Sequence, residues 1–414
     1  MKRENLSRYF QFFLVLLAAG AIFPIAYLRT NYQETLLEVF SLTIQQLNSI
    51  YSFLGVVWVL AYIPSGFLAD KFSTKKLLVI SLFGTALGGL IFSRIPSYPG
   101  VVFVYCMWGV FTVFTFWAAH MKMVKMLAGE NEEGRFFGIL DGGRGVVEAF
   151  LGSISLIIFT SVMGDKLDFA TKKTAIVSII YMYSIILVLT GVLIAIFVKE
   201  TKNVARTEDE KFKFSKLPLL LKNKNLYLHG MIIFFGYITY WTVYYLGGFL
   251  QSNVGVDPVT VGTVTVIVLW MRPVGGMIGG FLADKIGKIT TIIIVLIGAI
   301  CGLFILALLP TWTGKGMFYV VVVALAIFLY AIRGTYWSII GNDGFSLMLM
   351  GTAIGAISFF GYLPDILLPQ INSLIFNIFG AEKGYSAYFI FSALMGVVSI
   401  IVAMIYSKFQ KEEE

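Results

Sequence analysis

Long apolar runs separated by short polar segments dominate the chain. They cover approximately residues 9–31, 47–69, 77–93, 100–122, 136–162 and 176–198, and they resume at 226–250, 259–283, 290–309, 317–339, 347–372 and 386–407. A bilayer core about 30 Å thick needs roughly 20 apolar helical residues to cross it. The pattern therefore predicts an all-α membrane protein with twelve transmembrane helices.

The composition agrees with a chain that faces lipid. Of its 414 residues, 58% are hydrophobic and 13% are charged, whereas a soluble protein carries roughly 25% charged residues. The net charge is +8, but most of the basic residues lie outside the apolar runs, predominantly on the side of the two termini. This distribution places both termini in the cytoplasm, with the bacterial plasma (inner) membrane as the expected location. It does not predict nucleic-acid binding, which needs a basic face on a soluble domain.

Polar residues at 199–225 divide the runs into two sets of six. This segment holds eight basic residues and the acidic cluster 208–210. We therefore expect two pseudo-symmetric six-helix bundles, at 1–198 and 226–414, joined by a cytoplasmic linker at 199–225.

A sequence repeat relates the two predicted bundles. The hexapeptide Gly-Phe-Leu-Ala-Asp-Lys occurs at 66–71 and again at 280–285, each time at the end of an apolar run. A weaker echo relates Thr-Phe-Trp at 115–117 to Thr-Tyr-Trp at 335–337. Internal repeats of this kind are how transporters place one site between two bundles.

These motifs resemble those of the major facilitator superfamily over essentially the whole chain. The family's loop motif is Gly-x-x-x-Asp-(Arg/Lys)-x-Gly followed by basic residues, and the second copy here matches it through Gly287; the first has Ser73 in that place. The resemblance implies a transporter whose motif residues act as conformational gates. Those residues are Gly66, Asp70, Lys71, Gly280, Asp284 and Lys285.

Three ionisable residues lie inside the run at 136–162. Asp141, Arg144 and Glu148 share one face of a helix. Charges inside the hydrocarbon region usually mark a transport pathway. One interpretation is a proton-coupling or charge-relay site with Glu148 as the proton carrier and Arg144 as its partner. The other is a charge triad that only fixes helix packing.

Arg272 lies at the centre of the run at 259–283, with no acidic residue within four positions. A guanidinium there can bind carboxylate or phosphate in bidentate fashion, or it can pair with an acid such as Asp365. Asp365 follows Pro364, which we expect to bend its helix, and it is either a coupling site or the mate of an arginine. Arg333 is expected to reach the membrane interface, and His120 to lie at that interface.

Arg29 stands in the segment Arg29-Thr30-Asn31 of the first run. This segment resembles the first-helix Arg-x-Asn of organophosphate:phosphate antiporters and related organic-anion carriers, in which the arginine binds the anion. Those carriers have a second arginine in helix 7, where this chain has Trp241. A central arginine in helix 8, as at Arg272, is similar to oxalate:formate and nitrate carriers.

Aromatic residues with polar tips follow one face of the seventh run. They are Tyr237, Tyr240, Trp241 and Tyr244, and Trp117 of the fourth run is expected to join this surface. Because buried Tyr hydroxyls need partners, either a substrate or ordinary packing explains the pattern.

Motifs of other protein classes are not found. The sequence has no phosphate-binding loop and no His-Glu-x-x-His, and its two cysteines, Cys106 and Cys301, have no metal-binding spacing. We therefore expect no enzyme, no catalytic residue, no metal and no cofactor.

These observations favour a secondary active transporter that moves a small organic anion by alternating access. The cargo would be a sugar phosphate, a sugar acid or a carboxylate, coupled to protons or a counter-anion, and carried by a monomer. Two alternatives stay open: an exporter of neutral or cationic amphiphiles, and a transporter-like membrane sensor that signals through the linker.

Overall fold

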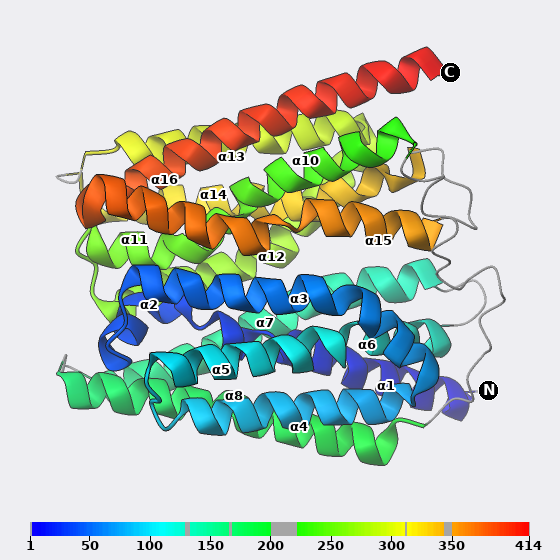
Figure 1. The fold of residues 1–414 in the computed structure, drawn as a ribbon, viewed down its shortest axis with the longest axis horizontal. Coiled ribbons are helices and arrows are strands. Elements are labelled where there is room, and N and C mark those ends of the chain that lie inside the picture. Colours follow the sequence, from blue (N-terminus) through cyan, green and yellow to red (C-terminus); the bar gives the residue numbers. More distant parts are fainter. Residues whose placement is uncertain are drawn as a thin grey trace. The chain divides into compact units, whose positions relative to one another are not determined.

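The computed structural model describes residues 2–128, 133–164, 168–199, 222–310, 313–342 and 350–413, and it leaves out a number of side chains within these ranges, those of Asp70 and Asp141 among them. All regular secondary structure in these ranges is helical, which confirms the all-α prediction (Figure 1). Eleven helical stretches of this described part are long and apolar enough to cross a membrane. The expected span at 347–372 overlaps residues 343–349, which lie outside these ranges, so a total of twelve stays a prediction.

The chain divides into two compact units. The N-terminal unit comprises Met1–Val204 and Asp257–Trp270, and the C-terminal unit comprises Ala205–Val256 and Met271–Glu414. One long helix, α12 (Pro258–Ile286), therefore contributes its first half to the N-terminal unit and its second half to the C-terminal unit. The predicted bundle limits stay a prediction, since most of the linker (200–221) lies outside the described residues.

The helices of the N-terminal unit run roughly parallel or antiparallel to one another (Figure 1). Their bounds are α1 Lys2–Ala21, η1 Pro24–Tyr27, α2 Arg29–Val39, α3 Ile44–Lys71, α4 Thr74–Phe92, α5 Tyr98–Gly109, η2 Val110–Phe114, α6 Trp117–Leu127, α7 Glu133–Met163 and α8 Phe169–Phe197. Extensive contacts join α4 to α8, α3 to α5, and α1 to α7.

The C-terminal unit has a related order of elements. Besides the second half of α12 it contains α10 Lys224–Tyr240, η5 Trp241–Tyr245, α11 Leu246–Ser252, α13 Lys288–Leu308, α14 Lys315–Thr335, η6 Tyr336–Asn342, α15 Met350–Gly361 and α16 Pro364–Glu413. Helix α16 bends at Gly380 and packs against α10 and α13, and α15 lies along α10.

Local capping explains where several helices begin. Thr43 and Gln46 form a capping box at the start of α3. Asp168 accepts hydrogen bonds from the backbone N–H (3.0 Å) and the hydroxyl (2.7 Å) of Thr171 at the start of α8. The bond from the Thr171 hydroxyl makes the larger contribution and the backbone bond the next, and together they hold the pKa of Asp168 below its usual value.

Glycines let neighbouring elements approach closely, as their spacing predicts. In α4, a Cβ added at Gly84 would lie 2.4 Å from the ring of Phe111, and one at Gly88 would lie 2.5 Å from the indole nitrogen of Trp108. These two glycines therefore receive aromatic rings. In α12, a Cβ at Gly275 would lie 2.5 Å from the carbonyl oxygen of Ile327, so α12 and α14 meet backbone to backbone.

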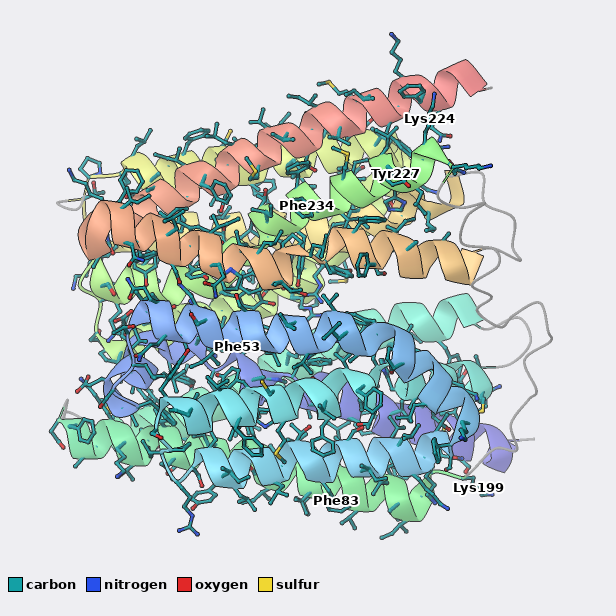
Figure 2. The ribbon with its side chains drawn as sticks, in the orientation of Figure 1. Phe53, Phe83, Lys199, Lys224, Tyr227 and Phe234 are labelled. Carbon is teal, nitrogen blue, oxygen red and sulfur yellow. The ribbon has the colours of Figure 1, made fainter. Side chains whose placement is uncertain are left out.

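Large apolar side chains cover much of the exposed surface. Phe83 of α4 and Tyr227 of α10 are examples, at 39% and 40% exposure (Figure 2). Many Leu, Ile and Phe side chains of α8, α13 and α16 are more exposed than these two. Water-soluble monomers rarely expose so much contiguous apolar area, whereas lipid solvates it.

Candidate functional site

Helical interruptions fall at corresponding places in the two units. The first segment of the N-terminal unit changes from α1 to the 3₁₀ turn η1 and then to α2, and that of the C-terminal unit changes from α10 to η5 and then to α11. The fourth segment is interrupted by the π-helical stretch η2 between α5 and α6, and α14 ends in the 3₁₀ turn η6. Discontinuous helices free backbone and polar groups for ligands at membrane depth.

Arg29 is fully buried directly after η1. Its Nη1 donates to Oδ1 of Asn48 (3.1 Å) and its Nη2 to Oε1 of Gln33 (2.8 Å), while the guanidinium lies 4.9 Å from the ring centroid of Tyr51. The Tyr51 hydroxyl donates in turn to the carbonyl oxygen of Ala26 in η1. Both of these acceptors are uncharged amide oxygens, and the two bonds orient the guanidinium.

The next turns of α2 contact α7. Tyr32 has non-helical dihedral angles. Its hydroxyl is hydrogen-bonded to the hydroxyl of Ser155 at 3.0 Å, and its ring packs on Phe159. The first half of α12 joins the same surface of α7, because Trp270 donates to the Ser153 hydroxyl at 3.1 Å. These contacts join α2 and the first half of α12 to α7.

Arg144 of α7 is buried among aromatic rings. Its guanidinium lies 5.3 Å from the ring centroid of Phe23 and 5.7 Å from that of Trp117. Geometry of this kind is typical of cation–π contacts. Glu148, one turn further along α7, is half-buried, and the side chain of Asp141 lies outside the description. The proposed relay through these three residues stays a prediction.

His120 is enclosed within the N-terminal unit, which differs from the expected interfacial place. Its ring stacks on Phe116 at 4.8 Å and meets Trp117 edge-on at 5.2 Å. The local helix α6 turns this imidazole inward, and its side chain has no exposed surface. Sequence position alone did not reveal which face of α6 is buried.

The aromatic residues of the seventh segment form a cluster in the C-terminal unit. The rings of Tyr237 and Tyr240 stack at 5.6 Å with an interplanar angle of 14°. Tyr244 meets Tyr240 and Trp241 edge-on at 6.0 and 5.1 Å, although the helix changes to 3₁₀ geometry after Tyr240. Tyr362 packs on Tyr237 from the loop between α15 and α16.

Asp365 lies against this cluster. Its Oδ1 accepts hydrogen bonds from the Tyr237 hydroxyl (2.9 Å) and the Trp241 indole N–H (3.0 Å), and the residue is 4% exposed. Pro364 is the first residue of α16, so it begins a helix where the sequence predicted a bend within one. The helix N-terminus favours a negative charge at Asp365.

Arg333 approaches the cluster from the last turn of α14. Its Nη1 donates to the Tyr240 hydroxyl at 2.9 Å, and its guanidinium lies 5.0 Å from the centroid of the same ring. Arg333 thus contacts an aromatic ring of the C-terminal unit, and its expected reach to the membrane interface stays a prediction. Because Tyr330 and Arg333 are three residues apart, they share the helix face that meets Tyr240.

Arg272 occupies the centre of α12, directly before Pro273, and is half-buried. It belongs to the C-terminal unit, whereas Arg29 and Trp117 belong to the N-terminal unit. The predicted binding residues are thus distributed over both units, with Tyr237, Tyr240, Trp241 and Tyr244 brought together with Asp365.

The gate motif takes different forms in its two copies. Lys71 in the first copy, and Asp284 and Lys285 in the second, are exposed at helix ends, and a Cβ at Gly66 or Gly280 would meet open space. Gly287 is the residue before α13 and has φ 92° and ψ 149°. Ser73 is the residue before α4, has φ −57° and accepts a hydrogen bond from the backbone N–H of Lys76.

Sequence reasoning missed Asn48 and Gln33, which orient Arg29. It named Tyr240 as a candidate binding residue but did not predict its hydrogen bond with Arg333. The signal of Asn48 was a polar side chain within an apolar run, but its partner Arg29 lies 19 residues away on another helix.

An all-helical protein of two units, with interrupted helices and buried cations, has the architecture of a membrane transporter. The chain belongs to the Major Facilitator Superfamily, whose profile matches residues 9–369. It is therefore a multi-pass integral membrane protein, and the expectation from the repeated motif is confirmed.

Curated relatives match along nearly the whole chain. The inner membrane protein YqcE of Escherichia coli K12 is 25% identical, with 99% of this chain and 97% of the relative covered. The inner membrane protein YihN of the same strain is 27% identical, with 97% and 96% covered. The D-galactonate transporter of E. coli O6:H1 (strain CFT073) is 21% identical, with 88% of each chain covered.

Solved structures share the fold. A bacterial homologue of the human lysosomal transporter Spinster has a TM-score of 0.78 at 13% identity, with 99% of this chain and 98% of that chain covered. The nucleoside transporter NupG has a TM-score of 0.73 at 13% identity, with 96% and 99% covered.

Proposed function

We propose that this protein is a secondary active transporter that moves a small organic anion by alternating access. The observation that carries the proposal is the environment of Arg29, a buried guanidinium oriented by two uncharged amide oxygens. Ionisable groups at membrane depth are costly and usually serve transport. A carboxylate or phosphate supplies the charge-assisted, bidentate bonds that a guanidinium accommodates best.

Arg272 and the aromatic cluster are proposed as further substrate contacts. Arg272 is half-buried at the centre of α12, and Trp117 lies against Arg144 near the interruption of the fourth segment. The D-galactonate transporter among the relatives carries a sugar acid by name, which supports the sugar-acid class among the three considered.

Coupling is proposed to use protons or a counter-anion. Glu148, with Arg144 and Asp141 on α7, is the proposed proton relay, and Asp365 is its counterpart in the C-terminal unit. Asp70 and Asp284, with their neighbouring glycines and lysines, are the proposed gates. We place the protein as a monomer in the bacterial inner membrane, with both termini in the cytoplasm.

The experiment described below also tests two alternative functions. An exporter of neutral or cationic amphiphiles would use mainly the rings around Tyr240. A transporter-like sensor would bind a ligand without moving it.

Measurement of flux into proteoliposomes distinguishes the anion transporter from the amphiphile exporter and the sensor. Purified protein is reconstituted, and uptake of labelled D-gluconate, glucose 6-phosphate and tetraphenylphosphonium is compared with uptake into protein-free liposomes. The proposal expects saturable uptake of at least one of the two anions. Uptake of the cation alone supports the exporter, and binding of an anion without flux supports the sensor; either result overturns the proposal.

A further inference from the structure

Two opposite charges lie close to one aromatic pair in the C-terminal unit without meeting each other. We propose that Arg333 and Asp365, spaced by Tyr237 and Tyr240, form a subsite for a hydroxylated carboxylate, in which Arg333 binds the carboxylate and Asp365 accepts a hydrogen bond from a hydroxyl group. The proposal rests on the function proposed above and names the chemistry of its cargo. It also assigns substrate contact to Arg333 and gives Asp365 a role other than proton coupling.

The stacked tyrosines hold the two charges apart. Asp365 accepts a hydrogen bond from the Tyr237 hydroxyl, and Arg333 donates one to the Tyr240 hydroxyl. The rings of Tyr237 and Tyr240 are nearly parallel, with their centroids 5.6 Å apart. Both charged residues belong to the described part of the chain, and no ion pair joins them there. A structural pairing would bring the carboxylate onto the guanidinium, because a direct buried pair is the usual way to offset desolvation.

Each charged group keeps unused hydrogen-bonding capacity. Both protein donors to Asp365 bind its Oδ1, and Oδ2 receives none from any described residue. Arg333 uses only Nη1 among the described residues, which leaves Nη2 and Nε to donate, and its side chain is partly exposed. One acceptor and two adjacent donors match a ligand that carries a hydroxyl group and a carboxylate.

The surrounding rings suit the carbon skeleton of such a ligand. Tyr362 accepts from the Trp337 indole N–H at 2.9 Å and lies 3.4 Å from the Tyr336 hydroxyl. Tyrosine and tryptophan combine an apolar face with a polar tip, so they pack on C–H groups and still bond hydroxyls. An ammonium group has three donors to satisfy. Among the described residues hydrogen-bonded to this tyrosine pair, Asp365 is the one carboxylate and its Oδ2 accepts no bond from them, so a hydroxyl fits this position better.

Rigid backbone positions fix both charges. Helix α14 contacts α12 through backbone atoms at Gly275, and Pro364 sets the first turn of α16 directly before Asp365. Pre-organised groups lose little entropy when a ligand binds.

Calorimetric titration of the purified full chain tests the subsite with three probes. D-gluconate carries a carboxylate and hydroxyls, hexanoate carries only the carboxylate, and D-sorbitol carries only hydroxyls. Arg333→Gln should weaken gluconate binding about tenfold or more and leave sorbitol unchanged. Asp365→Asn should weaken gluconate by a similar factor and leave hexanoate unchanged. Exposed Arg94→Gln and the helix cap Asp168→Asn are the matched controls.

The outcomes separate this inference from the proposed function. If gluconate does not bind the wild type, or if both variants change all three probes equally, the subsite is wrong. Should either variant fail to fold, as judged by gel filtration and thermal unfolding, Arg333→Lys and Tyr240→Phe replace it, and both should weaken gluconate more than sorbitol. Anion flux that persists with unchanged gluconate affinity in Arg333→Gln overturns only the subsite, whereas absent anion flux in the wild type overturns the function itself.

Discussion

At the residue scale, uncharged partners orient the buried arginines of both units. Arg29 donates to two amide oxygens, Arg144 lies between two aromatic rings, and Arg333 donates to one tyrosine. Such contacts fix the direction of a guanidinium and of its N–H donors. An anionic cargo would therefore bind where the protein has already positioned the donors.

The candidate site was only partly predictable at this scale. Spacing along one helix identified Tyr237, Tyr240, Trp241 and Tyr244 as a group, and the structure places two of them on Asp365. Helix periodicity is local, so it reveals shared faces. Gln33 is one helical turn from Arg29, but Asn48 and the Tyr240 partner of Arg333 come from other helices, and no local pattern specifies them.

The first copy of the repeated motif has Ser73 where the second copy has Gly287, and the backbone explains this difference. Gly287 has backbone angles that residues with a Cβ rarely adopt, whereas Ser73 has an ordinary φ and caps its helix through its hydroxyl. The two turns follow different paths, so each residue suits its own copy.

A reciprocal swap at this position should have unequal effects. Gly287→Ser should destabilise the protein by about 1–3 kcal/mol because of backbone strain. Ser73→Gly keeps a favourable backbone and should cost only a few tenths of a kcal/mol, roughly the difference between these two caps. Thermal unfolding of the purified variants, followed by tryptophan fluorescence, compares them. Equal melting temperatures would contradict this explanation of the motif.

At the element scale, the sequence predicted the membrane spans but not the interruptions within the first and fourth segments. Hydropathy located each described span to within several residues, because apolar length is what a bilayer selects. It could not locate η1, η2 or η5, since the residues there are as apolar as their neighbours. Pro24 and Pro364 mark two of the breaks, but a proline in a sequence does not tell whether it bends or begins a helix.

Two adjacent glycines in α12 provide a test of the packing against α14. A Cβ at Gly275 would lie 2.5 Å from a backbone oxygen that cannot move cheaply, while one at Gly276 would meet open space. Gly275→Ala should therefore lower the melting temperature and the transport rate. Gly276→Ala should keep both, or raise stability slightly through better helix propensity. Identical behaviour of the two variants would contradict the observed contact.

At the scale of the whole molecule, the residues proposed for transport belong to both units. The N-terminal unit holds Arg29 and Glu148, and the C-terminal unit holds Arg272, Arg333 and Asp365. The repeat predicted the family, which the profile match confirms, while the two six-helix bundles stay a prediction. It could not predict the cargo, because the motif residues lie at helix ends and are mostly exposed.

Proton coupling through Glu148 is a prediction at this scale. In Glu148→Gln proteoliposomes, an inwardly directed proton gradient should no longer drive anion accumulation, while anion exchange at equal pH continues, because exchange needs no net proton movement. The exposed Glu38→Gln serves as the control. Gradient-driven accumulation at the wild-type level in Glu148→Gln would contradict the relay and favour a counter-anion.

The most direct test of the central claim is the initial rate of anion uptake with and without the charge of Arg29. Proteoliposomes of the wild type, Arg29→Gln and Arg94→Gln are matched for protein content and orientation, and uptake of the transported anion is measured below saturation. The account predicts a fall of about tenfold or more for Arg29→Gln, as for the loss of a charged hydrogen-bonding group, and none for Arg94→Gln. Uptake by folded Arg29→Gln at the wild-type rate and affinity would contradict it.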